Sequence, residues 1–300
     1  FIEKHQIKTY FYKDENYPYR LTHCVDAPIM LYAKGNVEVN PKHVVSVVGT
    51  RMPSERGKDW CRRFILDLAA KVPEVTIVSG LAYGIDVIAH KAAMESGIST
   101  IIIPAHGLDR IYPSVHRSVA VQALDKGGIL TEYTRETEPE RFNFVARNRI
   151  VAGMADAVVV VESKKKGGSL ITADMAVDYG RDVFAMPGRV DDICSAGCND
   201  LIKRNKAQLI DYADDLIAAM QWQEQSTEAI QTCLVEMMYD LTDNQHRLLQ
   251  LLRETEDGLH INQLVMETQL AYSIVSSELV MMELQDMVKS MPGGMWRVKK

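Results

Sequence analysis

Short apolar runs alternate with longer helical patterns between residues 44 and 221. Seven runs, most of them rich in β-branched residues, predict strands at 44–48, 75–78, 100–103, 128–131, 157–161, 183–186 and 208–210. The apolar spacing between them predicts helices at about 54–71, 85–96, 114–126, 145–154, 170–180, 198–206 and 212–221. This alternation is typical of βαβ units, so we expect an α/β fold, a Rossmann-like three-layer domain with a mostly parallel sheet. Its ligand is expected at the carboxyl ends of the strands.

The segments on either side of this domain have other patterns. Residues 1–43 are rich in turns and predict a lead-in segment that packs on the core of the Rossmann-like domain, 44–222. Residues 223–235 are largely polar and predict a linker, and 236–300 predict a small winged-helix-like domain. Its helices are expected at 242–254, with Thr242 or Asp243 as N-cap, and near 260–268 and 272–285. A hairpin over 288–298, with its turn at Pro292-Gly293-Gly294, completes it.

Composition narrows the class of protein. The chain has 300 residues, of which 47% are hydrophobic and 25% charged, which excludes a disordered chain and suits two globular domains. We expect no membrane segment, because no apolar run approaches the ~20 residues that span a bilayer, and no secretory signal, because residues 1–10 are polar. The chain begins on Phe1, which predicts a fragment. Five scattered cysteines favour a reducing, cytoplasmic location, and no zinc-ligand spacing completes the pair Cys194 and Cys198.

The net charge of −6 is distributed unevenly. Residues 223–300 carry 12 acids and 6 bases, whereas residues 1–222 carry 28 of each. The C-terminal part therefore accounts for the whole excess of acid. A site for nucleic acid in this protein has to be a local basic patch in the first 222 residues.

Two glycine-containing turns close the first two predicted strands. Arg51 follows Gly49 and Thr50, and an arginine there can pair with a phosphate while the glycine lets an anion approach the backbone. Gly80 opens the turn before the next helix, where backbone amides suit a phosphate. A structural turn with an exposed arginine is the alternative for the first motif. For Asp86, in the second, we favour a helix cap.

Two basic segments follow predicted strands four and five. Residues 141–150 interleave three arginines with two aromatic rings and two asparagines, which suits a single strand because cations follow its backbone and rings stack on its bases. The alternative is that Arg147 and Arg149 pair with carboxylates such as Glu132. Residues 162–173 place three lysines before Gly167, Gly168 and Ser169 at a helix start, which predicts an anion-binding loop that is not a Walker A loop.

These motifs and their order resemble the DprA/Smf family, the DNA-processing proteins of bacterial natural transformation. The resemblance covers roughly 15–222 and rests on Gly49-Thr50-Arg51, Ser79-Gly80-Leu81-Ala82-Tyr83-Gly84-Ile85-Asp86, Arg147-Asn148-Arg149-Ile150-Val151 and Lys166-Gly167-Gly168-Ser169-Leu170-Ile171-Thr172-Ala173. It implies a homodimeric, non-catalytic protein that binds single-stranded DNA, protects it and loads the RecA recombinase. It also implies that Arg51 and Lys166 contact phosphates, with Gly168 and Ser169 presenting amides and a hydroxyl.

Combining the motifs with the resemblance gives one set of expected DNA contacts. It comprises Arg51, Gly80, Arg147, Asn148, Arg149, Lys164, Lys166, Gly168 and Ser169. We expect no metal, cofactor or catalytic residue, since no histidine stands beside a serine or cysteine nucleophile.

Two features depart from this simple picture. The segment 199–207 varies the family's usual ending, and the helical N-terminal domain of many members is absent from this chain. The predicted recognition helix, 272–285, contains no lysine or arginine, so we expect the C-terminal domain to contact protein or regulate access rather than bind duplex DNA.

A Rossmann-like nucleotide-binding or nucleotide-hydrolysing enzyme remains the alternative function. Lysine-decarboxylase-like hydrolases carry a Pro-Gly-Gly-x-Gly-Thr motif followed by a catalytic glutamate. Here lysines precede Gly167 and Gly168, and no glutamate lies in the helix that follows. The conceivable acids are Asp86, Glu132 and Glu162.

Overall fold

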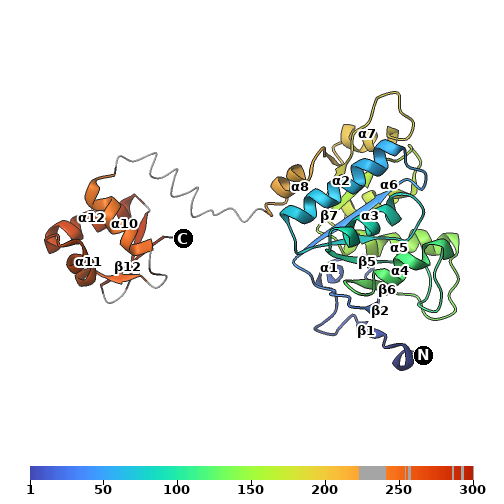
Figure 1. Cartoon of the computed structure of the whole chain (residues 1–300), viewed down its shortest axis with the longest axis horizontal. Helices are drawn as coiled ribbons and strands as arrows, with labels where there is room; N and C mark the ends of the chain where they lie inside the picture. The colour runs from blue at the N-terminus through green and yellow to red at the C-terminus, as the bar shows by residue number, and fades with distance from the viewer. Residues whose placement is uncertain (223–240, 254, 256–257, 286, 292–293, 300) are drawn as a thin grey trace. The chain divides into compact units, whose positions relative to one another are not determined.

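The computed structural model describes residues 1–222, 241–253, 255, 258–285, 287–291 and 294–299 (Figure 1). The chain divides into two compact units, Phe1–Trp222 and Gln223–Lys300. The predicted linker at 223–235, and the predicted start of the second domain at residue 236, lie outside the described residues.

The first unit is built on a nine-stranded sheet. The seven predicted strands are confirmed as β3 (His43–Gly49), β4 (Val75–Ser79), β5 (Ser99–Ile102), β6 (Gly128–Thr131), β7 (Ala157–Val161), β8 (Asp182–Ala185) and β9 (Gln208–Leu209). They lie in the order β6-β5-β4-β3-β7-β8-β9 and are mutually parallel. Apolar side chains on both faces of a strand suit a sheet covered on both sides, and all five residues of β7 are buried.

The lead-in segment contributes two further strands. β1 (Lys8–Phe11) pairs antiparallel with β2 (Met30–Gly35), which pairs antiparallel with β6. Between them the short helix α1 (Tyr19–Thr22) carries Arg20, whose buried guanidinium donates to Asp156 from Nε at 2.7 Å. The segment is thus part of the same sheet, which is mostly parallel with two antiparallel strands at one edge.

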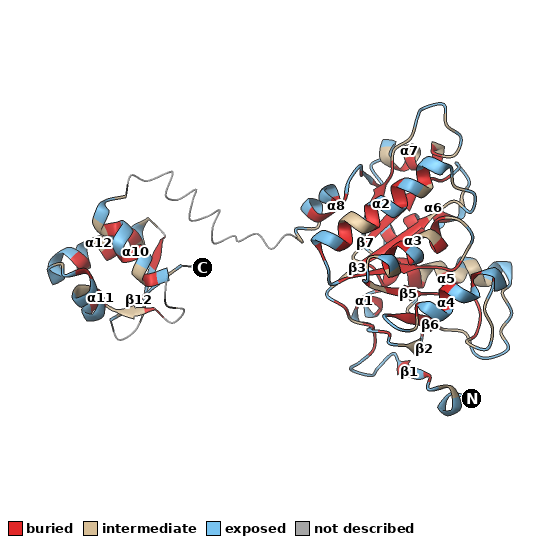
Figure 2. Cartoon of the chain, viewed as in Figure 1, coloured by how far each residue is buried: buried red, intermediate tan, exposed pale blue. Residues whose placement is uncertain are grey.

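Helices cover both faces of this sheet, and Figure 2 shows their buried sides turned toward it. The helical elements are α2 (Glu55–Lys71), α3 (Ile85–Glu95), η2 (Ser114–His116), α4 (Arg117–Gln122), α5 (Arg141–Gly153), α6 (Gly168–Asp178), α7 (Ala196–Lys203) and α8 (Ala213–Ala219). One core cluster joins α2, α3 and α8 to the sheet, and another joins α5, α6 and α7 to it. The predicted helix at 114–126 is a 3-10 turn followed by a short helix, and the one predicted at 145–154 begins four residues earlier, at Arg141.

The centre of the sheet is a topological switch point. β3 and β7 are neighbours, and the helices that follow them, α2 and α6, lie in the cores on opposite faces of the sheet. The loops after the two strands therefore diverge. A crevice opens between them at the carboxyl ends, where ligands bind in open α/β sheets.

The second unit has the predicted winged-helix-like architecture. Its helices are α10 (Asp243–Arg253), α11 (Ile261–Thr268) and α12 (Tyr272–Leu284), and its sheet has the order β10 (Leu259–His260), β12 (Met295–Val298), β11 (Val288–Met291). Thr242 caps α10, because the Gln245 amide donates to Thr242 Oγ1 at 3.2 Å and the Thr242 amide to Gln245 Oε1 at 3.0 Å. The wing turn at Pro292 and Gly293 lies outside the described residues. Across the described parts of the chain, the structure contains no helix with the length and apolarity to traverse a lipid bilayer.

Candidate functional site

A cleft of about 700 Å³ lies at the carboxyl edge of the central strands. Loops after β3, β4, β5 and β7 and the first turns of α5 and α6 line it. Five of its lining residues are cations, namely Arg51, Arg141, Arg147, Lys164 and Lys166, whereas Asp86 is its one acid. The lining thus has a formal charge of +4. An anion is the ligand that such a cleft favours.

The loop after β3 presents Arg51 to the cleft. A side chain at Gly49 would overlap the Val161 carbonyl and Ile85, so only glycine fits where the strand ends against α3. The loop then turns outward, and the exposed Arg51 guanidinium lies 5.5 Å from the centre of the Phe144 ring. That cation-π contact orients the guanidinium without neutralising it.

The turn after β4 forms the floor of the cleft. Gly80 has no room for a side chain, because a Cβ there would overlap the Arg147 guanidinium and lie 2.5 Å from Asp86 Oδ2. Asp86 in turn accepts a hydrogen bond from the Ala82 amide at 3.2 Å. The absence of a side chain at Gly80 therefore leaves room for Asp86 and Arg147 directly beneath the floor of the cleft.

Arg147 is the buried base, and its side chain is only 4% exposed. Its Nη1 donates to the Ile103 carbonyl, while its Nε has no partner in the part of the chain that the structure describes. Burial lowers the pKa of Arg147 and raises the pKa of Asp86, and in each case the charge of the other residue opposes the change. Each charge thus favours the ionised form of the other residue. Asp86, which the sequence predicted as a helix cap, is therefore also the electrostatic partner of Arg147.

The loop after β7 carries the lysines. Lys164 and Lys166 are exposed, and neither has a carboxylate within 4.0 Å among the described residues. The loop is held from within, since Ser169 Oγ donates to Ser163 Oγ at 2.9 Å and the Gly197 amide to the Ser163 carbonyl at 2.7 Å. A rigid loop that carries unpaired cations is preorganised for a phosphate.

Three of the helices that begin at this edge, α2, α3 and α6, follow the adjacent strands β3, β4 and β7, and protein carboxylates lie at the N-termini of two of the three. Glu162 accepts from the Ser54 amide at 2.8 Å at the start of α2, and α3 carries Asp86 in its own first turn. α6 has no acid in its first turn and no side-chain cap, and a Cβ at Gly168 would meet nothing within 4 Å. Of these three, the start of α6 is therefore open to an anion from outside.

Aromatic rings line the outer part of the cleft. Tyr83 is 52% exposed and Tyr112 48% exposed, and the Tyr112 ring lies 6.0 Å from that of Phe144. Phe142, the other ring of the predicted basic segment, is 77% exposed and does not line the cleft. The sequence motifs contained Tyr83, in the turn after the second predicted strand, and Arg141, in the basic segment 141–150, without assigning either to the site, and Tyr112 belonged to neither motif. Of the three, only Arg141 belongs to the segment in which arginines alternate with aromatic rings.

Eight of the nine predicted contact residues line this cleft, and Arg149 is the exception. Residues two apart on a helix face different directions, so Arg147 and Arg149 of α5 separate. Arg149 Nη2 donates to Glu132, the pairing that the sequence left open as the alternative, and its Nε lies 4.0 Å from Asp26. Burial raises the pKa of Glu132, and the Arg149 charge opposes that rise.

The histidines near the cleft are engaged with the backbone. His90 is fully buried, with Nε2 2.6 Å from the Gly80 carbonyl and Nδ1 2.7 Å from Thr100 Oγ1. Because a carbonyl only accepts, Nε2 carries the proton. The described residues contain no group of three or more histidine, cysteine or acidic side chains suited to a metal.

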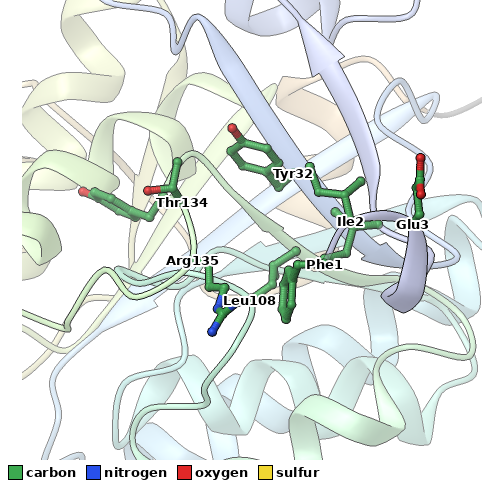
Figure 3. A pocket seen from close by; sticks show the side chains of 9 residues that line it. Phe1, Ile2, Glu3, Tyr32, Leu108, Thr134 and Arg135 are labelled. Carbon is green, nitrogen blue, oxygen red and sulfur yellow. The ribbon is translucent and has the colours of Figure 1, made fainter.

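A second pocket lies apart from these motifs. It measures about 530 Å³ and lies between the N-terminal residues, β2 and the loops after β5 and β6. Figure 3 shows Phe1, Ile2, Tyr32, Leu108 and Arg135 among the side chains around it. Arg135 pairs with Glu136 at 2.9 Å, so the pocket offers mainly apolar surface. The cleft remains the candidate for an anionic ligand.

Comparison with known proteins gives a consistent result for both units. The family model for DNA recombination-mediator protein A matches residues 8–221, and the model for the DprA winged helix domain matches 239–294. The chain is 40% identical to DNA processing protein DprA of Streptococcus pneumoniae, over 70% of this chain and 73% of that protein. It is 34% identical to Protein Smf of Synechocystis, over 98% of this chain and 81% of that protein.

Solved structures have the same fold. The X-ray structure of DprA from Streptococcus pneumoniae superposes with a TM-score of 0.68 at 38% identity, covering 72% of this chain and 76% of that one. A structure of DprA from Helicobacter pylori, described by its single-stranded DNA binding mode, gives a TM-score of 0.65 at 31% identity. It covers 72% of this chain and 96% of that one.

Proposed function

The chain belongs to the DNA recombination-mediator protein A family, and on this basis we propose that its cleft binds single-stranded DNA. It has a DNA-processing role in recombination, for which its family and relatives are named. The observation that carries the proposal is the coincidence of unpaired cations with the one unfilled helix N-terminus among α2, α3 and α6. The single-stranded DNA binding mode described for DprA from Helicobacter pylori agrees with it.

Phosphates are bound along the inner wall of the cleft. Arg51, Lys164 and Lys166 supply charge from two loops, and Gly168 and Ser169 supply the amides of the α6 N-terminus. Gly80 lines the cleft above the buried residues Arg147 and Asp86, so Arg147 attracts a phosphate by its charge from beneath the floor rather than by a free side chain. Arg149 supports α5 through Glu132.

Bases face the aromatic rim. Tyr83, Tyr112 and Phe144 offer ring faces on which unpaired bases stack without regard to sequence, and Asn148 supplies an amide beside them. The bases of a duplex are stacked on each other and cannot stack on these rings, so the rings contribute no binding energy toward a duplex. The cleft therefore prefers single strands.

The protein acts by binding rather than by catalysis. The one acid of the cleft, Asp86, lies beneath the floor beside Arg147 and is 8% exposed. A carboxylate in this position stabilises the turn after β4, through its hydrogen bond from the Ala82 amide, rather than reacting with a ligand. We infer further that the protein needs no cofactor and works in the cytoplasm as a homodimer, where it protects single strands and loads a RecA-type recombinase onto them, as the recombination-mediator family name suggests.

Equilibrium binding tests the proposal. Fluorescent oligo-dT and a matched duplex are titrated over a salt series with the wild-type chain and with the double variant Arg51→Ala, Lys166→Glu. We expect salt-sensitive, strand-selective binding by the wild type, with a log–log slope of about −0.7 per neutralised phosphate, and its loss in the double variant. A control double variant, Arg63→Ala with Lys91→Glu, makes the same changes on exposed helix positions outside the cleft.

Three results oppose the proposal. Absence of oligo-dT binding at low salt excludes the function. Unchanged binding by the cleft variant moves the site elsewhere. Full displacement of oligo-dT by a mononucleotide favours the alternative nucleotide-binding protein.

A further inference from the structure

Glu162 is an acid at the root of a cationic cleft. It directly follows β7, is 2% exposed and has a φ of +53°, in the left-handed region that non-glycine residues seldom adopt. Among the described residues no lysine or arginine lies within 4.0 Å of its carboxylate. A buried carboxylate in an unfavourable backbone conformation persists only where its surroundings hold it.

The surroundings that hold Glu162 are the loop after β3. The Thr50 amide donates to the Glu162 carbonyl at 2.9 Å. At the other end of the same loop, the Ser54 amide donates to Oε2 at 2.8 Å and the Ser54 hydroxyl to Oε1. Both ends of the segment that contains Arg51 are thus attached to one residue.

The neighbouring helix leaves room for this carboxylate. Ser54 caps α2 by accepting from the Gly57 amide at 3.1 Å, and a Cβ on Gly57 would lie 2.5 Å from Glu162 Cδ. Gly57 is buried. A larger residue there would displace the carboxylate from the Ser54 amide.

On its other side Glu162 continues into the lysine loop. Ser163, the next residue, is buried and is tied to Ser169 of α6 and to Gly197 of α7. Lys164 and Lys166 follow within four residues. The lysine loop is therefore held through Ser163, independently of the Glu162 carboxylate, so loss of that carboxylate displaces the Arg51 loop relative to it.

We infer that Glu162 is a positioning residue that holds the Arg51 loop at a fixed distance from the lysine loop, so that one DNA strand contacts both. This inference rests on the proposed function of the cleft and assigns Glu162 no contact with DNA. Its role is geometric, through the three hydrogen bonds that it accepts from Thr50 and Ser54.

Charge alone predicts the opposite effect for Glu162. A carboxylate beside a phosphate site repels the ligand, so its neutralisation should tighten binding if electrostatics were its only influence. The positioning role predicts that Glu162→Gln weakens binding, because an amide presents one acceptor where two donors must be satisfied. The sign of the change therefore separates the two accounts.

The experiment measures oligo-dT affinity for the wild type, Glu162→Gln, Arg51→Ala and the double variant Glu162→Gln, Arg51→Ala. We expect Glu162→Gln to weaken binding about tenfold and to have no further effect once Arg51 is absent, because the residue acts through the placement of that arginine. Glu95→Gln is the matched control, since Glu95 pairs with Arg62 on an exposed helix face outside the cleft.

Ser54→Ala provides a second variant, because it removes a hydroxyl partner and leaves the charge of Glu162 in place. We expect weaker binding from it too, and thermal unfolding confirms that each variant is folded at the assay temperature. Equal or tighter binding by Glu162→Gln, or the same loss with and without Arg51, overturns the inference while leaving the proposed function intact. Failure of the wild type to bind oligo-dT removes both.

Discussion

Arg147 and Arg149 show how the same residue type, two positions apart, takes two different roles. Arg147 lies under Gly80 beside Asp86, and Arg149 bridges to Glu132 on another face of α5. The sequence predicted both as contacts from the basic character of 141–150 and left carboxylate pairing open. Helical periodicity separates the two residues, but it does not say which of them faces the ligand, because that depends on strands distant in the sequence.

Arg149 and Lys166 should respond differently to truncation. Arg149→Ala leaves Glu132 half-buried without its cation, so we expect a loss of about 2 kcal/mol in the free energy of unfolding and a nearly unchanged salt slope of DNA binding. Lys166→Ala should leave stability unchanged and reduce the magnitude of the salt slope by about 0.7. Urea unfolding and a salt series on both variants measure this, and a salt-slope change in Arg149→Ala would contradict it.

His90 makes stability depend on pH. Burial lowers its pKa to about 4, with the Arg147 charge acting in the same direction, whereas an unfolded histidine has a pKa of about 6.5. Its contribution is therefore fully present above pH 6.5 and is lost as the pH falls toward 4, on the order of 3 kcal/mol in total. Asp86, whose pKa burial raises, has the opposite dependence and must be separated from it.

Comparison with His90→Gln makes that separation. The difference in unfolding free energy between wild type and variant, measured in urea from pH 7 to pH 4.5, should shrink as the pH falls. A constant difference would show that His90 does not titrate in this range.

At the scale of single elements, the fully buried strands could be predicted from the sequence and the partly buried ones could not. All residues of β4, β6 and β7 are buried, and their apolar runs predicted the strands directly. β1 and β2 are only partly buried, with polar residues among the apolar ones, so the lead-in segment showed turns and no strand. The first turn of α5 was missed for a similar reason, since Arg141–Phe144 is exposed or half-buried at the cleft.

The open start of α6 allows one substitution to move stability and affinity in opposite directions. Gly168→Asp places a carboxylate at an unfilled helix N-terminus, which should raise the unfolding free energy by about 0.5 kcal/mol and weaken oligo-dT binding by more than about tenfold. In the control variant Gly168→Asn the side chain has the shape of aspartate but no charge, so both the gain in stability and the loss of affinity should be smaller. Equal affinities of the Asp and Asn variants would show that no phosphate binds there.

The absence of cations on α12 predicts the behaviour of the second unit toward duplex DNA. Tyr272–Leu284 contains two glutamates and no lysine or arginine, and Tyr272, Met281 and Leu284 are exposed. A polypeptide of residues 236–300 should therefore bind a duplex no more tightly than non-specific association at physiological salt, about 10⁻⁴ M or weaker. Micromolar duplex binding in a mobility-shift assay would show that other surfaces of this unit recognise DNA.

At the scale of the whole molecule, the charge distribution and the cleft agree. The first 222 residues are neutral in sum, yet five cations and one acid line one cleft, while many other cations pair with carboxylates on the surface. The sequence predicted a local basic patch for this reason. It did not predict that Glu162 fills the N-terminus of α2, because that contact joins residues 108 positions apart in the chain.

Single-strand binding should reside entirely in the first unit. Every residue that lines the cleft lies between Val48 and Thr172, within Phe1–Trp222. A polypeptide of residues 1–222 should therefore bind oligo-dT within about threefold of the full chain, because compact units with their own cores fold and bind independently. A larger loss in the same anisotropy assay would show that the second unit contributes to this ligand.

The pairing of β3 with β7 at the centre of the sheet also bears on how the protein reaches its active form. Ser54 and Glu162 are 108 residues apart in the chain, and the hydrogen bond between them joins the loops that follow these two strands. Contacts of such separation form late, because a long loop must be ordered before they stabilise anything. During refolding, most helices and the β3–β4–β5 neighbours can assemble from nearby segments, whereas DNA binding returns only once the long-range contact between Ser54 and Glu162 has formed. A newly made chain can therefore look largely folded by its helical content before it is able to hold a strand.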